Sequence, residues 1–494
     1  SPLWVAKHGV SSINYQHEVD NLVYQGYRPR CLNAFASGTS AKFNYFWVNT
    51  NYSAADMAKI DNAVNNYRTA QNVNGVSLAI TKNGRLVFAK GYGYANPSTG
   101  EILSPNHSLR IMSISKSATS VGILTLVQAG KLSLNQLVFG PNGILGTKYP
   151  TPVGKEKLNS IRVRHLLTHT SGLRTCNGEA VFWDQTKTPD NAMSVLLASP
   201  TLIKNDAGVV YEYSNTGFFI LERIIEQVSG LKYESYIRTN VLAKSGIGST
   251  MYVGQASGNI KAGESTYNPM HNMNLQLWAG FGGWVARPID LLKFLNRVDG
   301  QATPSDIITA STHTTMTTGT TQNPNYALGW VVSGSLQNHN GCFGGSSSFL
   351  VERGNGISYA IILNSTPTNG DCSGGLKNAL DVALSQVVAF PSYNLFDNIG
   401  PGARVEESFA QDDASQNDVA EDANLVTVYP KPSVDGLIHF NNAAIIKSVT
   451  VIDAMGVTER HAGAIAELKT NLKGLLILKI ETEQGTVTDK VIVE

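Results

Sequence analysis

The spacing of apolar residues along the chain predicts a mixed domain in which strands enclose a group of helices. Strand-like segments at 76–81 and 86–91 flank Asn83-Gly84, a strong hairpin signal. Helical patterns occupy 54–70, 113–129, 163–167 and 216–228, and strand-like segments return at 327–333, 346–352 and 358–364. We expect an α/β (α+β) fold with one antiparallel sheet, flanked by helices and accompanied by a helical region.

The two ends of the chain differ from this middle region, so four segments result. Residues 1–50 predict a short helix, a turn at Gly26 and two strands, a module that is too small to be independent and is expected to pack on the large domain next to it. Residues 51–392 form that large domain. Residues 393–424 are predicted to be an acidic linker, because eight acidic residues stand against one arginine between 396 and 424. Alternation with glycine at the turns predicts a β-sandwich at 425–494.

Composition excludes several classes of function. The chain has 494 residues, a net charge of +1 and 15% charged residues, which gives no electrostatic case for nucleic acid or membrane partners. No apolar run reaches the roughly 18 residues of a membrane span. The sequence begins at Ser1-Pro2 without Met, which fits removal of a signal peptide and a trimmed chain equally.

The four cysteines are Cys31, Cys176, Cys342 and Cys372. Four cysteines allow three pairings, and the sequence does not choose among them. The first expectation is a Cys342–Cys372 bond, because these two flank the strand-like segment 348–363. No Cys-x-x-Cys or clustered His/Cys spacing is present, so we predict no metal site and no cofactor.

Ser113-Ile114-Ser115-Lys116 is the strongest chemical signal. Positions i and i+3 share a helix face, so the Lys116 amine can lie beside the Ser113 hydroxyl. Serine needs a neighbouring base, and lysine can serve only where burial or a nearby cation lowers its pKa. The same spacing recurs at Ser229–Lys232, but Ser229-Gly230 there predicts the end of a helix.

Two later patterns add partners for this pair. Tyr213-Ser-Asn215 offers a phenol, which a close ammonium would shift towards phenolate, and an amide that donates and accepts. His339-Asn-Gly341 predicts a strand edge where glycine lets substrate approach, and the backbone N–H of Cys342 joins that of Ser113 as oxyanion donors. Asn215 as a helix N-cap and His339 as an ordinary edge residue are the plainer alternatives. The tryptophans Trp183, Trp278 and Trp284 either line a cleft or are buried.

In this order, Ser113-x-x-Lys116, Tyr213-x-Asn215 and His339-x-Gly341 resemble the motifs of the penicillin-recognising serine hydrolases, in the branch of class C β-lactamases, DD-peptidases and esterases. Segments 165–173 and 326–330 resemble further signatures of that branch. The resemblance implies a β-lactamase/transpeptidase-like fold with an all-helical subdomain, Ser113 as acylating nucleophile, and Lys116 and Tyr213 as the proton-transfer pair. It also implies Asn215, His339 and Gly341 as substrate and network residues.

One residue departs from the β-lactamase motifs, and both ends of the chain resemble further known domains. Many β-lactamases carry lysine at the position of His339, whereas histidine is more usual in esterase and peptidase members. Residues 1–50 resemble the short repeat of polyglycine hydrolases. Residues 425–494, through Val428-Tyr-Pro-Lys-Pro-Ser433 and Asp453-Ala-Met-Gly456, resemble the sorting domain of the type IX secretion system, which implies export and a secretion-machinery partner.

The sequence therefore predicts a secreted serine hydrolase that forms an acyl-enzyme on Ser113. Peptide amides, either glycine-rich or of the cell-wall type, are the favoured substrates. The alternatives are a carboxylesterase of the same fold, a β-lactamase, and a non-catalytic binding or sensor protein.

Overall fold

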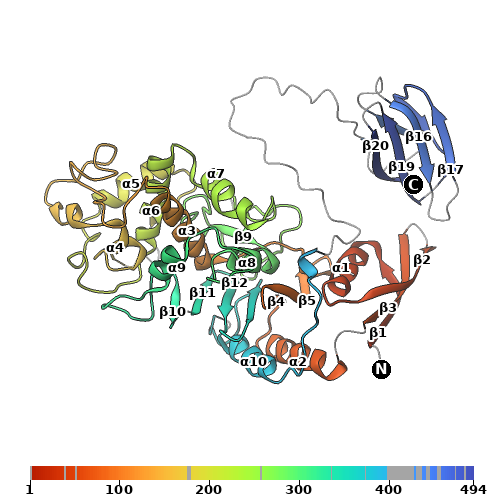
Figure 1. Cartoon of the computed structure of the whole chain (residues 1–494), viewed down its shortest axis with the longest axis horizontal. Coiled ribbons are helices and arrows are strands. Elements are labelled where there is room, and N and C mark those ends of the chain that lie inside the picture. The colour runs from red at the N-terminus through yellow and green to blue at the C-terminus, as the bar shows by residue number, and fades with distance from the viewer. Residues whose placement is uncertain are drawn as a thin grey trace. The chain divides into compact units, whose positions relative to one another are not determined.

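A computed structural model gives the fold. It describes the chain except for residues 1–2, 38–39, 50–52, 175–179, 256–258, 335, 373, 398–427, 430–436, 441–445, 453–457, 473, 483–484 and 494. The chain divides into two compact units, Ser1–Glu407 and Ser408–Glu494 (Figure 1). Cys176, most of the predicted acidic linker, and the segments 430–433 and 453–456 lie outside the described residues.

A seven-stranded antiparallel sheet organises the first unit, with strand order β10-β11-β12-β13-β4-β5-β6. Its strands are β4 (Gly75–Lys82), β5 (Arg85–Asn96), β6 (Glu101–Ile102), β10 (Val331–Ser333), β11 (Leu336–Phe343), β12 (Ser346–Glu352) and β13 (Ile357–Leu363). The predicted hairpin joins β4 and β5, and Asn83 and Gly84 both have positive φ, as this turn requires. Because early and late strands meet at β4 and β13, the helices between them form an insertion into one sheet.

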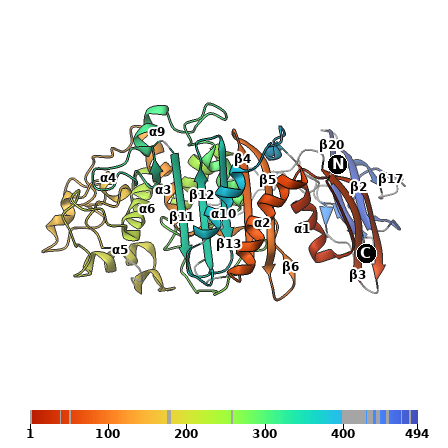
Figure 2. The ribbon, with the colours of Figure 1, turned by 90° about the horizontal axis from the view of Figure 1, so that it is seen from below.

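Successive side chains along each strand point to opposite faces of the sheet, and each face packs into its own apolar core. Leu78 and Ile80 pack with α2 (Ala54–Ala70) and α10 (Gly374–Ser385), which Figure 2 shows in front of the sheet. Ala79 belongs to the other core, with α8 (Pro288–Leu295) and the inserted helices. The catalytic candidates lie on this second side.

The inserted helices are α3 (Ser115–Gln128), α4 (Val163–Leu167), α5 (Pro189–Ala198), α6 (Asn215–Ser229), α7 (Tyr233–Ile237) and α9 (Ala310–Thr317). A small sheet of β7 (Leu109–Arg110), β9 (Trp284–Ala286) and β8 (Tyr252–Val253) lies beside them. Helix α3 is buried over most of its length and packs on α6. A helix buried on all sides is a fixed platform, and Ser113 immediately precedes it. The predicted mixed fold with a helical part is confirmed.

The N-terminal residues form a three-stranded sheet with one helix: β1 (Leu3–Ser11), α1 (Ser12–Val23), β2 (Arg28–Ser37) and β3 (Ser40–Asn49). The sequence prediction missed β1, because Gly9 and the bulge after Lys7 interrupt its alternation. The module packs on the large domain, as expected. Asn21 at its centre accepts from the Gly91 N–H at 2.7 Å and donates to the Leu103 carbonyl at 2.9 Å.

The second unit holds two antiparallel sheets. One contains β14 (Val428–Tyr429), β15 (Leu437–Phe440) and β18 (Glu467–Lys469), and the other contains β17 (Thr458–Ala462), β16 (Ile446–Ile452), β19 (Gly474–Thr482) and β20 (Gly485–Val493). Both sheets contribute to one apolar core that includes Ile438, Val449 and Leu478. These small sheets agree with the predicted β-sandwich. Among the described helices of the whole chain, none has the length and apolarity to cross a membrane.

Candidate active site

Ser113 lies in a strained turn at the start of the buried helix. It occupies the short 3-10 segment Met112–Ile114 that runs into α3. Met112 has φ of 47°, a region that costs a non-glycine residue about 1–3 kcal/mol. The turn is held from both sides, since the Ile111 N–H donates to Trp284 O at 3.0 Å and the Ser348 hydroxyl donates to Ile111 O at 2.8 Å. Neighbouring strands therefore fix the position of the Ser113 hydroxyl.

Lys116 is completely buried beside Ser113. Its Nζ lies 3.1 Å from Ser113 Oγ and donates to the Phe281 carbonyl at 2.9 Å. Burial lowers the pKa of Lys116 well below its ordinary value, since the charged form loses its water. A lysine with a lowered pKa carries the lone pair that a general base needs. Both conditions set by the Ser-x-x-Lys spacing, proximity and burial, are met.

The glycine-rich segment 278–284 forms the wall behind Lys116. Glu222 accepts from the Gly280 N–H at 2.7 Å, and Thr119 donates to Gly280 O at 2.7 Å. A Cβ on Gly280 would lie 2.5 Å from the Phe218 carbonyl, so only glycine fits. These contacts fix the neighbouring Phe281 carbonyl that accepts from Lys116. Trp278 and Trp284 are buried in this wall, so burial accounts for both.

Tyr213 faces the same hydroxyl. It interacts with Ser113 through a hydrogen bond, and its ring centroid lies 4.7 Å from Lys116 Nζ. Burial raises the pKa of Tyr213, and the hydrogen bond from Ser113 offsets this only in part. The expectation of a phenolate stabilised by an ammonium is therefore wrong, because burial opposes both charges. Burial therefore favours the neutral form of both groups.

Asn215 is the first residue of α6, but it does not cap the helix. The N-cap is Ser214, whose hydroxyl accepts from the Gly217 N–H at 3.2 Å, so the plainer alternative for Asn215 is wrong. Within the described part of the chain, the buried Oδ1 of Asn215 has no hydrogen-bond partner. An amide oxygen two residues along the chain from Tyr213 is therefore left for a substrate N–H.

The third pattern lies on β11, next to the nucleophile turn. The ladder from β11 to β10 ends at Asn338, so among the described strands His339–Phe343 pair with β12 alone. A Cβ on Gly341 would lie 2.3 Å from Ile111 O and 2.8 Å from Met112 Cβ. Glycine therefore lets β11 pack against the turn that carries Ser113, rather than admitting substrate as expected. Cys342, the predicted second oxyanion donor, comes next on the same strand.

Cys342 forms a disulfide with Cys372, which confirms the first expectation among the three pairings. The two Cα atoms are 5.4 Å apart. The bond ties the end of β11 to the segment that precedes α10.

His339 is buried and interacts with residues that motif spacing did not single out. Its Nδ1 lies 2.7 Å from Asn340 O, and its Nε2 lies 3.2 Å from the Tyr326 hydroxyl. The same hydroxyl lies 3.0 Å from His169 Nε2. Burial lowers the pKa of His339 to about 3. His169 therefore makes structural hydrogen bonds, and the sequence indicated it and Tyr326 only as parts of segments 165–173 and 326–330.

An aromatic group borders the free end of β11. Phe343 is 39% exposed and lies 5.5 Å, between ring centroids, from the half-buried Trp183. Trp183 in turn contacts Trp278, with centroids 5.6 Å apart. Of the three candidate cleft tryptophans, Trp183 is the one with an open face.

One group of side chains in the described residues has the spacing of metal ligands: His17, Glu101 and His107, whose ligating atoms lie within 4.8 Å of one another. Metal-bound histidines normally donate from the other ring nitrogen. Here the Ser104 N–H donates to His107 Nδ1 at 3.0 Å, which places the proton on Nε2, 3.1 Å from Glu101. The buried His17 Nδ1 has no acceptor in the described part of the structure. We interpret the group as a hydrogen-bonded contact between the N-terminal module and the large domain.

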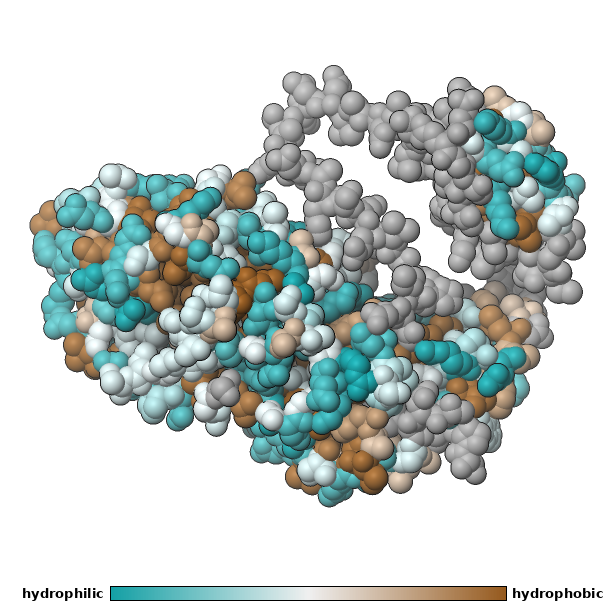
Figure 3. Space-filling view, in the orientation of Figure 1, coloured by the Kyte–Doolittle hydropathy of each residue, from teal (hydrophilic) through white to brown (hydrophobic). Residues whose placement is uncertain are grey.

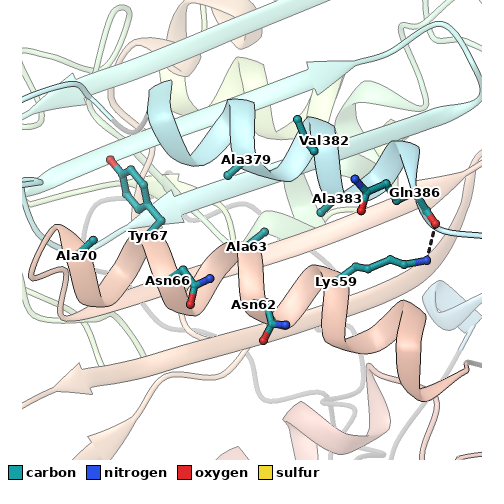
Figure 4. A pocket seen from close by; sticks show the side chains of 10 residues that line it. All are labelled: Lys59, Asn62, Ala63, Asn66, Tyr67, Ala70, Ala379, Val382, Ala383 and Gln386. Atoms are coloured by element: carbon teal, nitrogen blue, oxygen red, sulfur yellow. Dashed lines mark hydrogen bonds between the residues drawn. The ribbon is translucent and has the colours of Figure 1, made fainter.

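A groove of about 640 Å³ lies between α2 and α10, away from these residues (Figure 4). It is lined by Lys59, Asn62, Ala63, Asn66, Tyr67, Ala70, Ala379, Val382, Ala383 and Gln386. Figure 3 shows apolar residues over the same two helices. Because α2 and α10 cover the opposite side of the sheet from α3, this groove is separate from the candidate site.

Comparison with known families identifies the large domain. A model of the family described as "Beta-lactamase" matches residues 60–384. The chain belongs to the β-lactamase family. Its large domain has the fold of the β-lactamase-like superfamily. A second model, described as "Polyglycine hydrolase-like, structural repeat", matches residues 1–50, in agreement with the resemblance of the N-terminal segment.

Individual relatives match smaller parts of the sequence. Penicillin-binding protein 4* of Bacillus subtilis is 29% identical over 180 residues, 36% of this chain and 37% of the relative. Protein flp of Staphylococcus aureus (strain COL) is 28% identical over 190 residues, 37% of this chain and 36% of the relative. The chain thus matches little more than a third of the length of either relative.

Solved structures share the fold at low identity. D-amino acid amidase from Ochrobactrum anthropi SV3, complexed with L-phenylalanine amide, is 23% identical with a TM-score of 0.54, covering 67% of this chain and 97% of that one. The octameric penicillin-binding protein homologue from Pyrococcus abyssi is 19% identical with a TM-score of 0.56, covering 89% and 96%. These likenesses show the β-lactamase-like fold.

Proposed function

We propose that the chain hydrolyses peptide amides through an acyl-enzyme on Ser113. The observation that carries the proposal is the fully buried Lys116, with its Nζ 3.1 Å from Ser113 Oγ. The similarity to a D-amino acid amidase and to penicillin-binding protein 4* supports an acyl-transfer reaction. The repeat at residues 1–50, similar to that of polyglycine hydrolases, supports glycine-rich or cell-wall-type peptides over simple esters.

In acylation, the neutral Lys116 accepts the Ser113 proton as Oγ attacks the substrate carbonyl. The Tyr213 phenol donates its proton to the departing amine and regains one from Lys116, so the pair returns to neutrality. The N–H groups of Ser113 and Cys342 stabilise the oxyanion, and the Asn215 amide holds the substrate chain beside β11. Water then attacks the ester, its proton passes to the Lys116–Tyr213 pair, and Ser113 leaves with a proton.

A fluorophosphonate tests the nucleophile directly. It should add its mass to the peptide that contains Ser113, and Ser113→Ala should remove both the label and turnover of p-nitrophenyl esters. A folded wild-type protein, by circular dichroism, that takes up no label would overturn the proposal and favour a non-catalytic binder. Turnover of a cephalosporin tests the β-lactamase alternative. His339 disfavours that alternative, because it stands where many β-lactamases have lysine.

We also propose that the protein is exported, with residues 425–494 acting as a type IX sorting domain. The Cys342–Cys372 bond supports an oxidising compartment, where such bonds persist. Expression of the full chain and of a chain ending at 407 in a host with this secretion system tests the proposal. Export of the full chain alone is expected, and equal export of both would contradict it.

A further inference from the structure

His339 has no ring nitrogen left for a substrate. A carbonyl oxygen only accepts hydrogen bonds, so the 2.7 Å contact with Asn340 O places a proton on His339 Nδ1. In a neutral ring, Nε2 then presents its lone pair. The Tyr326 hydroxyl, 3.2 Å away, donates to that lone pair.

A second backbone group fixes the same direction from the other end. The Ser214 N–H donates to His169 Nδ1 at 3.0 Å, so His169 carries its proton on Nε2. That N–H donates to the Tyr326 oxygen at 3.0 Å, and the single proton of Tyr326 goes to His339. The chain of donors therefore runs one way, from Ser214 through His169, Tyr326 and His339 to Asn340 O.

This chain leaves the third motif without a charge. All three side chains are buried: His169, Tyr326 and His339. If His339 Nε2 carried a proton, that proton would point at the proton of the Tyr326 hydroxyl. Burial lowers the pKa of both histidines. The buried Lys116 amine is already in contact with Ser113 Oγ and the Phe281 carbonyl. The third motif thus presents no cation to a substrate.

We propose that the site selects substrates whose leaving group is uncharged, such as an internal peptide amide, a carboxamide or a neutral ester, over matched substrates whose leaving group carries a carboxylate. A carboxylate that lies against the third motif gives up water without gaining a cation from it, and an unpaired buried charge is costly. Selectivity arises from that penalty against the wrong substrate. The inference rests on the proposed hydrolase function and names its substrate class, with Tyr326 and His169 as positioning residues that act through His339.

Two N-acetylglycyl thioesters provide the test, one of mercaptoacetamide and one of mercaptoacetate. They differ in the charge of the leaving group, and the released thiol is measured directly. In the wild type, kcat/KM for the neutral thioester should exceed that for the anionic one by roughly tenfold or more, the usual effect of leaving a buried polar group unpaired. His339→Lys supplies an ammonium, so it should reduce this ratio about tenfold, mainly by lowering KM for the anionic substrate.

Asn62→Lys is the control. It adds the same charge at an exposed position of α2, on the opposite side of the sheet from the candidate site. The ratio should stay at the wild-type value, and intrinsic differences in thioester reactivity cancel in this comparison. Tyr326→Phe removes the hydroxyl that occupies His339 Nε2, so this nitrogen can take a proton and face a carboxylate, and the ratio should also fall.

The outcomes separate the inference from the function beneath it. Turnover of neither thioester by the wild type would overturn the proposed function itself. Equal wild-type turnover of both, dependent on Ser113, would overturn the charge selectivity alone. If Tyr326→Phe lowers both rates with an unchanged ratio, its role is structural and the positioning argument fails, even where His339→Lys does not fold.

Discussion

Ser113–Lys116 and Ser229–Lys232 have identical spacing and opposite surroundings. The first pair begins a buried helix, with Lys116 fully buried and a carbonyl and three aromatic rings around its amine. The second pair ends α6, where Gly230 adopts a left-handed conformation and Lys232 is exposed. The Ser229 hydroxyl accepts a hydrogen bond from the Leu231 N–H at 3.1 Å. Burial, rather than spacing, makes a lysine a base.

The largest expected difference between the pairs comes from removing the hydroxyl. Ser113→Ala should lower kcat on an activated ester by roughly 10⁴-fold or more, since the nucleophile is lost. Ser229→Ala should stay within about twofold of wild type. Initial-rate assays on matched preparations measure both, and comparable losses in the two variants would remove the distinction.

The second comparison removes the amine. Lys116→Met keeps the length and volume of the buried side chain and deletes the base, so kcat should fall by roughly 10²–10⁴-fold, the usual contribution of a general base. Lys232→Met, at an exposed position, should leave kcat unchanged. A Lys116→Met enzyme with wild-type kcat would assign the base to Tyr213 alone.

The third comparison tests whether glycine on β11 positions the active pair. Gly341→Ala places a Cβ 2.3 Å from Ile111 O, so the turn before Ser113 must shift, and a displacement near 1 Å can cost about 10²-fold in rate. Gly374→Ala enters open space and serves as the control. Crystal structures or thermal melts of both variants separate local displacement from unfolding, and wild-type kcat in Gly341→Ala would contradict the packing argument.

The smallest expected effect is on stability. The folded pKa of Lys116 lies well below the ordinary 10.5, so the unfolded chain binds more protons between those two values. The free energy of unfolding therefore rises with pH across that window and decreases again as pH falls. At pH 7, Lys116→Met should raise the free energy of unfolding by roughly 0.5–2 kcal/mol, and Lys232→Met should not. Urea unfolding at pH 7 and pH 10 measures the difference, and a gain that is larger at pH 10 would reverse the sign.

Local patterns predicted more of the fold than of the site's electrostatics. Period and turn residues were enough for the β4–β5 hairpin and for the helix that ends at Gly230. The first strand was missed, since its bulge breaks the alternation. The order of the motifs indicated Ser113 and Lys116, but the protonation of Tyr213 depends on burial by elements distant in sequence. Tyr326 joins His169 to His339 across more than 150 residues, which no local spacing encodes.

The free side of β11 has a consequence for handling the protein. No described strand pairs with His339–Phe343 on the side away from β12, so that side can take an extended substrate and equally a strand of another molecule. Phe343 adds an exposed aromatic ring at the end of that edge. Concentrated preparations should therefore self-associate through this edge, and a short extended inhibitor bound there should improve solubility as it blocks turnover.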